Sequence, residues 1–385
     1  MINTLKIPST PTFRLGRIVG FSAALLLTSA TASFAAGIPK LNAADTLIDA
    51  QLQAKHNGVT LKVAKTTTVD SQFIADAAID AINALQASSK VLPATIVTAA
   101  LNRVPQFAAS ISEAALAKVY GTTVFPALNT PAKKNKQVSS IVSTAFSKGL
   151  ATYKVGKLPN GNSFAGFGDK SDIATQITFK DVSALGNPAT LIISTDPKLP
   201  SPLQVVVTAA VKAAIKVKST DLEHNGVSGA VAGAIYETAG SNNSSIKDAV
   251  TANDAVVKAI LKTAAKSAST HALEIAQAAG YAFATTYRQT HATLSGQAAE
   301  VGLPEFLASN VADIVAAINS GLSPANAKKF AAPSKTKGQN LGKDLETSVI
   351  DGITKAYATS DSAGGSGRRG VYFADGVAHA VTKIN

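Results

Sequence analysis

The feature of this sequence that most constrains its fold is one hydrophobic spacing that recurs along most of the chain. Apolar residues and alanines stand at positions i, i+3, i+4, i+7 and i+8, with Ser, Thr, Lys and Asn between them. This spacing places one broad apolar stripe along a helix, so it predicts an all-α protein of about ten helices. The clearest stripes lie in residues 96–104, 138–146, 203–215, 227–235, 256–264 and 311–322. Pro93 and Pro202 suit the first turn of a helix, and Gly121 and Gly149 stand where helices are expected to end.

Two all-α architectures explain these stripes. Many stripes combine Ala with Val or Ile, which lets neighbouring helices approach closely. Similar stripes start near residues 203, 227 and 253, which favours a multi-helix array of paired helices stacked in a row, resembling an α-solenoid in its building principle. An irregular helical bundle fits the same stripes equally well. The sequence has no tetratricopeptide, ankyrin or leucine-rich signature, so both architectures stay open.

The helical period fails between residues 157 and 201, where a turn-rich stretch begins. We expect an irregular insertion or connector here. A small β-hairpin is expected within it, from Ile173–Val182 and Thr190–Ser194, because both runs are rich in β-branched residues. The remaining segments are an N-terminal helical region at 36–156, a central helical region at 202–322, a linker at 323–343, and a C-terminal helix with a flexible tail at 344–385.

Residues 1–35 have the organisation of a secretory signal peptide. Three basic residues precede an apolar run from Ile18 to Leu27, and small residues follow in a pattern that allows cleavage before Ser33 or before Ala36. Cleavage lowers the formal net charge from +12 to +9, because residues 1–35 hold three basic residues and no acidic ones. We expect a protein exported to the bacterial periplasm or the extracellular space, with no transmembrane segment after cleavage.

The absence of cysteine excludes several kinds of chemistry. The chain has no Cys, so it forms no disulfide scaffold, no zinc-finger array and no cysteine nucleophile. Gly365–Gly370 matches a dinucleotide-binding spacing, but it lacks the strand, the helix and the acidic residue that such a site needs. The five histidines show no metal-ligand spacing. The sequence therefore assigns no catalytic residue, no metal ligand and no cofactor.

Basic residues provide the only candidate binding positions. They fall in three short runs, and we expect them to contact an anionic surface through salt-sensitive attraction. Anionic envelope polymers or another protein are the expected partners, and nucleic acid is not, because aromatic residues are not interleaved with the basic ones. The candidates are Lys133, Lys134, Lys136, Lys328, Lys329, Lys335, Lys337, Arg368 and Arg369.

These observations support one functional hypothesis and two alternatives. The first is an exported, non-enzymatic helical protein that acts as a binding scaffold or as a structural component of the cell envelope. One alternative is an envelope-directed hydrolase whose catalytic residues are dispersed along the chain. The other is a helical protein that binds membranes peripherally.

Overall fold

The computed structural model describes residues 42–55, 68–155, 173–217, 226–240, 255–290, 303–330 and 344–361. Every regular element within these ranges is a helix, which confirms the all-α fold class. Contacts join Asn42–Asn385 into one compact unit. The expected signal peptide lies outside the described residues.

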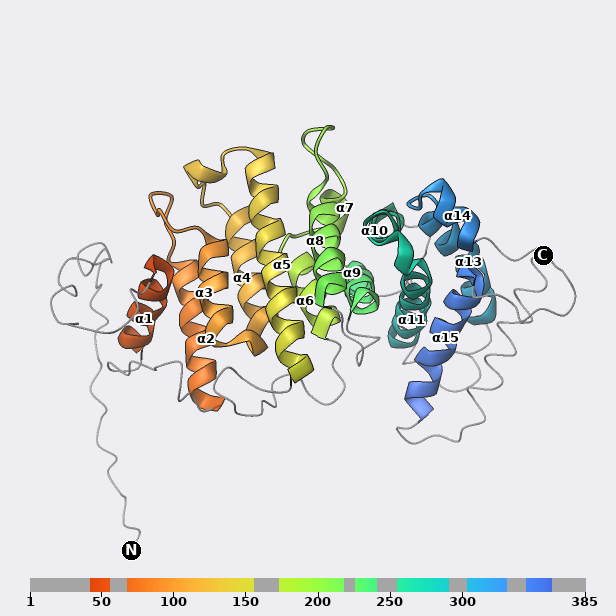
Figure 1. The fold of residues 1–385 in the computed structure, drawn as a ribbon, viewed down its shortest axis with the longest axis horizontal. Helices are drawn as coiled ribbons and strands as arrows, with labels where there is room; N and C mark the ends of the chain where they lie inside the picture. The colour runs from red at the N-terminus through yellow and green to blue at the C-terminus, as the bar shows by residue number, and fades with distance from the viewer. Residues whose placement is uncertain are drawn as a thin grey trace, which may run out of the picture. The chain divides into compact units, whose positions relative to one another are not determined.

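The described helices form two rows, and consecutive helices alternate between them (Figure 1). The helices of the first row are α1 (Ala43–Lys55), α3 (Pro93–Arg103), α5 (Pro131–Val155), α8 (Pro202–Val217), α10 (Ala255–Ser267) and α13 (Leu303–Asn319). The helices of the second row are α2 (Thr68–Asn83), α4 (Ala108–Tyr120), α6 (Ile173–Ser183), α9 (Val227–Gly240), α11 (Ala272–Thr290) and α15 (Leu345–Asp361). Two short helices, α7 (Pro188–Leu191) and α14 (Pro324–Phe330), lie in connections between them.

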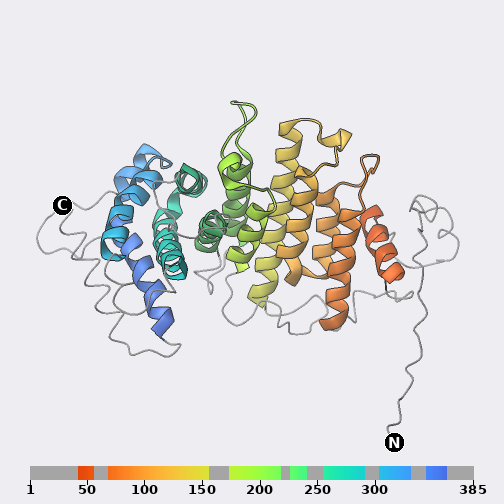
Figure 2. The same cartoon turned by 180° about the vertical axis from the view of Figure 1, so that it is seen from behind.

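Each helix packs against the next helix of its own row and against its neighbours in the other row. In the first row α3 contacts α5, α5 contacts α8, and α8 contacts α10. In the second row α4 contacts α6, α6 contacts α9, and α9 contacts α11. The same neighbours are visible from behind in Figure 2. Stacked helix pairs with nearest-neighbour packing are the arrangement of an α-solenoid, which favours that architecture over a bundle around one axis.

The predicted stripes form the core of this array. Residues such as Ile96, Val142, Val206 and Ile260 are fully buried between the two rows. The sequence also indicated several helix ends. Pro93 and Pro202 begin α3 and α8, and Gly121 follows α4 as its C-cap. Gly149 was expected to end a helix as well. That prediction is wrong, because α5 continues to Val155.

The β-hairpin expected within 157–201 is also wrong. Ile173–Ser183 is helix α6, and Pro188–Leu191 is the single helical turn α7. The buried residues of α6 recur at helical spacing, and they are Ile173, Ala174, Ile177, Thr178, Asp181 and Val182. The preference of β-branched residues for strands is weak, and packing against α4 and α9 overrides it here. Residues 157–172 of this segment lie outside the described residues.

Small residues allow the helices of the second row to approach closely. A Cβ added to Gly233 on α9 would lie 2.5 Å from the Thr175 carbonyl oxygen on α6, and 3.0 Å from Thr178 Cβ. A Cβ added to Gly352 on α15 would lie 2.9 Å from the Tyr281 amide nitrogen on α11. Backbone contacts backbone at these two crossings, so the glycines are needed for space rather than for an unusual dihedral angle.

One helical unit occurs twice. A 3-10 helix joins α3 to α4 at Pro105–Phe107, and another joins α10 to α11 at Ser269–His271, 164 positions later. The residues before them, Val104 and Ala268, have nearly the same backbone angles, with φ of −136° and −141° and ψ of 62° and 55°. The helices α1–α6 also pack among themselves in the same order as α8–α11 with α13 and α15. The array is therefore built from two similar halves.

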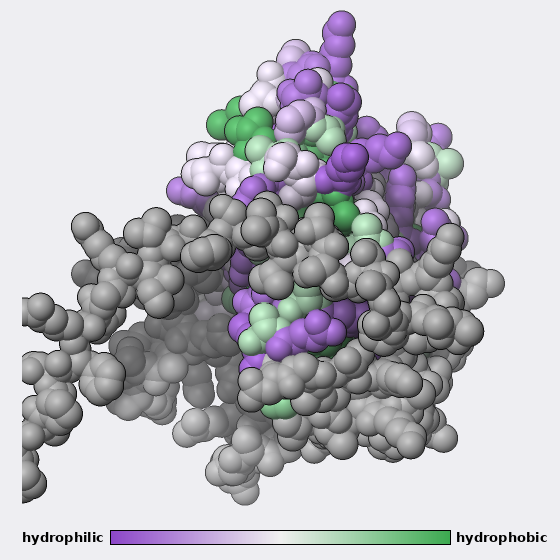
Figure 3. Space-filling view, turned by 90° about the vertical axis from the view of Figure 1, so that its left-hand side faces the viewer, coloured by the Kyte–Doolittle hydropathy of each residue, from purple (hydrophilic) through white to green (hydrophobic). Residues whose placement is uncertain are grey.

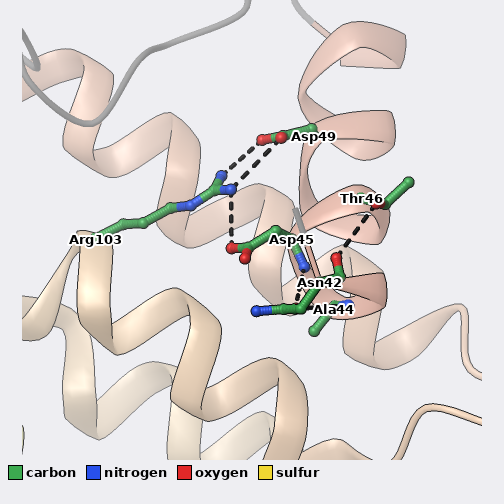
Figure 4. A network of polar contacts seen from close by, with 6 residues as sticks. All are labelled: Asn42, Ala44, Asp45, Thr46, Asp49 and Arg103. Carbon is green, nitrogen blue, oxygen red and sulfur yellow. Dashed lines mark hydrogen bonds and ion pairs between the residues drawn. The ribbon is translucent and has the colours of Figure 1, made fainter. Parts of the chain in front are cut away.

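A buried arginine ties the first helix to the array (Figure 4). Arg103, at the end of α3, is 7% exposed. Its guanidinium lies 2.6 Å from an Asp49 carboxylate oxygen and 2.9 Å from one of Asp45. Asn42 caps α1, because its Oδ1 accepts a hydrogen bond from the Ala44 amide at 3.0 Å. Two carboxylates thus satisfy one buried cation, which fixes α1 against α3.

Candidate functional site

The starts of three first-row helices meet at one edge of the array. The Ala94 amide at the start of α3 donates to Gln137 Oε1 of α5 at 3.3 Å. Asn135 Nδ2 of α5 donates to the Pro200 carbonyl, just before α8, at 3.2 Å. In Figure 1, α5 and α8 both begin at the upper side of the view. The first turns of α3, α5 and α8 are therefore neighbours.

Five lysines lie on these segments. Lys133, Lys134 and Lys136 occupy the beginning of α5, Lys90 precedes α3, and Lys198 precedes α8. All are exposed except Lys134, which is half-buried. We call these five residues the basic edge. The dipoles of three helix starts add partial positive charge at the same place, so the edge favours negatively charged groups.

Contacts within the chain hold part of the basic edge in place. Lys133 Nζ donates to Asn129 Oδ1 at 3.0 Å. The Lys134 ammonium lies 5.9 Å from the ring centre of Tyr120, at the range of a cation–π contact. Burial raises the pKa of Tyr120 to about 12, so its hydroxyl stays protonated and the side chain beside Lys134 is uncharged at physiological pH. Asp196 also lies at this edge, and its Oδ1 accepts from the Lys198 amide at 2.9 Å.

The other basic candidates are less concentrated. Lys328 and Lys329 are exposed on α14, in the segment expected to be a linker. The Lys329 ammonium lies 5.3 Å from the centre of the Phe330 ring, and Phe330 is buried. The remaining candidates, Lys335, Lys337, Arg368 and Arg369, lie outside the described residues.

Sequence reasoning missed two members of the basic edge. Lys90 and Lys198 are single lysines, more than thirty positions from the Lys133–Lys136 run on either side. No local charge run marks them. Each stands within four residues before a proline that begins a helix, and only the packing of α3, α5 and α8 brings them to the same edge.

A second group of ionisable residues lies inside the second row. Asp181 on α6 is fully buried, and neither of its carboxyl oxygens makes a hydrogen bond. Glu237 on α9 is only 8% exposed. Glu113 on α4 pairs with Lys180 on α6 at 2.9 Å, and both of these side chains are partly exposed. We call these four residues the acid cluster.

Burial dominates the titration of the two interior carboxyls. It raises the pKa of Asp181 well above its usual range, while the Ser112 hydroxyl acts in the opposite direction and the Glu113 charge adds to the rise. Burial raises the pKa of Glu237 to about 7, Glu113 again adds to the rise, and Lys180 opposes it. Both carboxyls can therefore hold a proton under conditions in which ordinary acids are charged.

No group of three or more ligand-type side chains that could hold a metal ion occurs in the described ranges. His271 Nδ1, in the 3-10 helix before α11, lies 3.1 Å from Glu274 Oε1 in the first turn of α11. Within the same ranges no helix is both long and apolar enough to cross a membrane.

The described residues expose few large apolar side chains. In the coloured part of Figure 3, which faces the α1 side, purple hydrophilic residues are common and green apolar areas are small and separate. Val124 and Ile193 are the most exposed large apolar residues described, at 70% and 65%. Charged side chains therefore define the candidate binding features better than apolar ones.

Comparison with models of protein families, with curated proteins and with solved structures gives no match to this chain.

Proposed function

We propose that this protein is an exported, non-enzymatic helical scaffold whose basic edge binds an anionic polymer of the cell envelope. The observation that carries the proposal is the convergence of five lysines on one edge of the array, three at the beginning of α5 and one each in the segments before α3 and α8. The net positive charge of the whole chain also favours binding of an anionic polymer. It is +12 before and +9 after removal of residues 1–35.

The physical basis is long-range attraction combined with multiple weak contacts. An exposed ammonium group keeps its water and holds a polyanion as a point charge, so a single lysine contributes little. Several lysines on adjacent segments bind successive charges of one polymer, and their contributions accumulate. A lysine near an anionic surface contributes about 1 kcal/mol at physiological ionic strength.

The test compares two variants with equal loss of charge. The edge variant carries Lys133→Gln, Lys134→Gln and Lys136→Gln. The control variant carries Lys212→Gln, Lys262→Gln and Lys266→Gln, which are exposed lysines on α8 and α10 outside the basic edge. Long-chain inorganic polyphosphate serves as the probe polymer, and vesicles of phosphatidylglycerol serve as the lipid alternative.

The edge variant is expected to bind polyphosphate more weakly than the wild type, on the order of 100-fold, from about 1 kcal/mol for each of the three removed lysines. The control variant is expected to remain within about twofold. Equal losses in both variants would mean that only net charge matters and would contradict the proposal. Binding to vesicles without binding to polyphosphate would assign the edge to a lipid surface instead.

The export part of the proposal has a separate test. Expression of the full chain in a bacterial host, followed by mass measurement of the protein in the periplasm and medium, is expected to show a chain beginning at Ser33 or Ala36. A full-length chain found only in the cytoplasm would contradict export while leaving the binding experiment interpretable.

A further inference from the structure

The acid cluster lies where three helices of the second row meet. Asp181 and Lys180 belong to α6, which packs against α4 on one side and α9 on the other. Glu113 comes from α4 and Glu237 from α9. The three carboxyls and one ammonium therefore link three consecutive members of the row, and Asp181 is the fully buried one among them.

The backbones of α6 and α9 approach closely at Gly233. Gly233 places the backbone of α9 directly against Thr175, as the 2.5 Å position of an added Cβ shows. Thr175 Oγ1 also donates to the Gly229 carbonyl at 3.2 Å. Asp181 is fully buried, so its charged form can be hydrated only if the helices around it separate, because an unpaired buried charge is far less stable than a hydrated one.

Burial outweighs the one polar group that favours a charged Asp181. The Ser112 hydroxyl of α4 lowers the pKa of Asp181, against the effect of burial. In the structure this hydroxyl donates to the Ala108 carbonyl at 2.7 Å, and neither carboxyl oxygen of Asp181 has a hydrogen-bond partner. Burial without a partner therefore favours the neutral acid.

The charges around the two carboxyls come from few residues. The Glu113 charge raises the pKa of both carboxyls, and the Lys180 charge lowers that of Glu237. Tyr236 neighbours Glu237 along α9. The other helices packed against α6 and α9 are α5, α8, α10 and α11, and their described ionisable side chains are exposed or half-buried: Lys133, Lys134, Lys136, Lys148, Lys212, Lys216, Lys258, Lys262, Lys266, Glu274 and Tyr281.

We propose that Asp181 and Glu237 form a proton-dependent latch that holds α4, α6 and α9 together when both carboxyls are neutral and loosens the array there when they ionise. The latch is independent of the basic edge. It lies at the boundary between the two halves of the array, because α6 ends the first half and α9 belongs to the second.

The sign of the effect follows from the raised pKa values. An unfolded Glu237 has its ordinary pKa of 4.5, and the folded one has a pKa of about 7. The stabilisation from the protonated form is complete below pH 4.5 and is lost as pH rises through 7. These two values correspond to a roughly 70-fold rise in the unfolding equilibrium constant between pH 5 and pH 8 from Glu237 alone. Asp181 acts in the same direction.

The experiment measures opening of the full chain as a function of pH. Hydrogen exchange of α6 and α9, corrected for the intrinsic pH dependence of exchange, and urea unfolding are recorded from pH 5 to pH 8.5. The variants are Glu237→Gln and Asp181→Asn, which keep the side-chain shapes without the acid. Glu274→Gln, an exposed acid on α11, is the matched control.

In the wild type, protection of α6 and α9 is expected to fall at higher pH while that of α3 stays constant. Glu237→Gln is expected to reduce the pH-dependent rise in opening at least tenfold. Glu274→Gln is expected to leave this rise unchanged. A wild-type pH profile retained in Glu237→Gln would overturn the latch, even if Asp181→Asn did not fold. Equal pH dependence in α3 and α6 would overturn it too, because the opening would then not be local.

Discussion

Gly233→Ala tests the close approach of α6 and α9 because two physical effects predict opposite signs. In the interior of a helix, alanine is more favourable than glycine by about 1 kcal/mol. Against this, the new Cβ would lie 2.5 Å from the Thr175 carbonyl oxygen and 3.0 Å from the Thr178 Cβ. Carbon and oxygen atoms in contact are ordinarily more than 3 Å apart, so α9 must move away from α6 by about 0.5 to 1 Å.

Such a gap removes a quarter to a half of the dispersion energy between the facing atoms, and overpacking typically costs about 1 to 3 kcal/mol. After the gain in helix propensity, we expect Gly233→Ala to lower the free energy of unfolding by about 1 to 2 kcal/mol. Urea unfolding followed by circular dichroism measures this change. Gly226→Ala, just before the same helix and with open space around the added Cβ, is the control and should change stability by less than about 1 kcal/mol. Stabilisation of Gly233→Ala by the full propensity gain would refute the close approach.

Two further predictions concern single side chains. Arg103→Met leaves two carboxylates without their buried partner, so it should lower the free energy of unfolding by about 2 to 4 kcal/mol. The control Lys55→Met removes the exposed partner of Asp80, so it should leave the midpoint of urea unfolding nearly unchanged. Tyr120→Phe removes a buried hydroxyl that has no hydrogen-bond partner, so stability should be unchanged or rise by up to about 1 kcal/mol. An ultraviolet titration of this variant should lack one tyrosine with a pKa near 12, and a clear loss of stability would show that the hydroxyl has a partner.

The helices could be predicted because the signal was long and repeated. Stripes such as Val138–Phe146 extend over more than two turns, and their apolar members are the buried ones. Helix α6 was missed because its stripe contains polar residues. Thr178 and Asp181 occupy buried positions there, so a run of β-branched residues outweighed the helical spacing.

That misreading also concealed Asp181. An acidic residue in register with Ile173 and Ile177 is the signal that could have identified a buried acid. The close crossing of α6 and α9 could have been suggested by Gly229 and Gly233, four positions apart on one helix. The partners of these residues come from distant segments, however, and only the folded array brings them together.

The two-row arrangement was one of two architectures that the sequence left open. Local spacing shows which face of a helix is buried, but it does not show which helix covers that face. The repeated unit offered a further clue, since Ile96, Ala100, Ala108 and Ile111 are matched by identical residues 164 positions later. These are core positions in both halves. Surface positions differ, so the similarity is weak in sequence and clear in packing.

The most direct test of the proposed function is the salt dependence of polyphosphate binding. Binding that releases counterions weakens linearly on a logarithmic scale of salt concentration, and each ionic contact adds about 0.7 to 0.9 to the slope. The edge variant should therefore have a slope smaller than the wild type by about 2 to 3, while the control variant, with the same net charge, keeps the wild-type slope. Equal slopes in all three proteins would contradict binding at the basic edge.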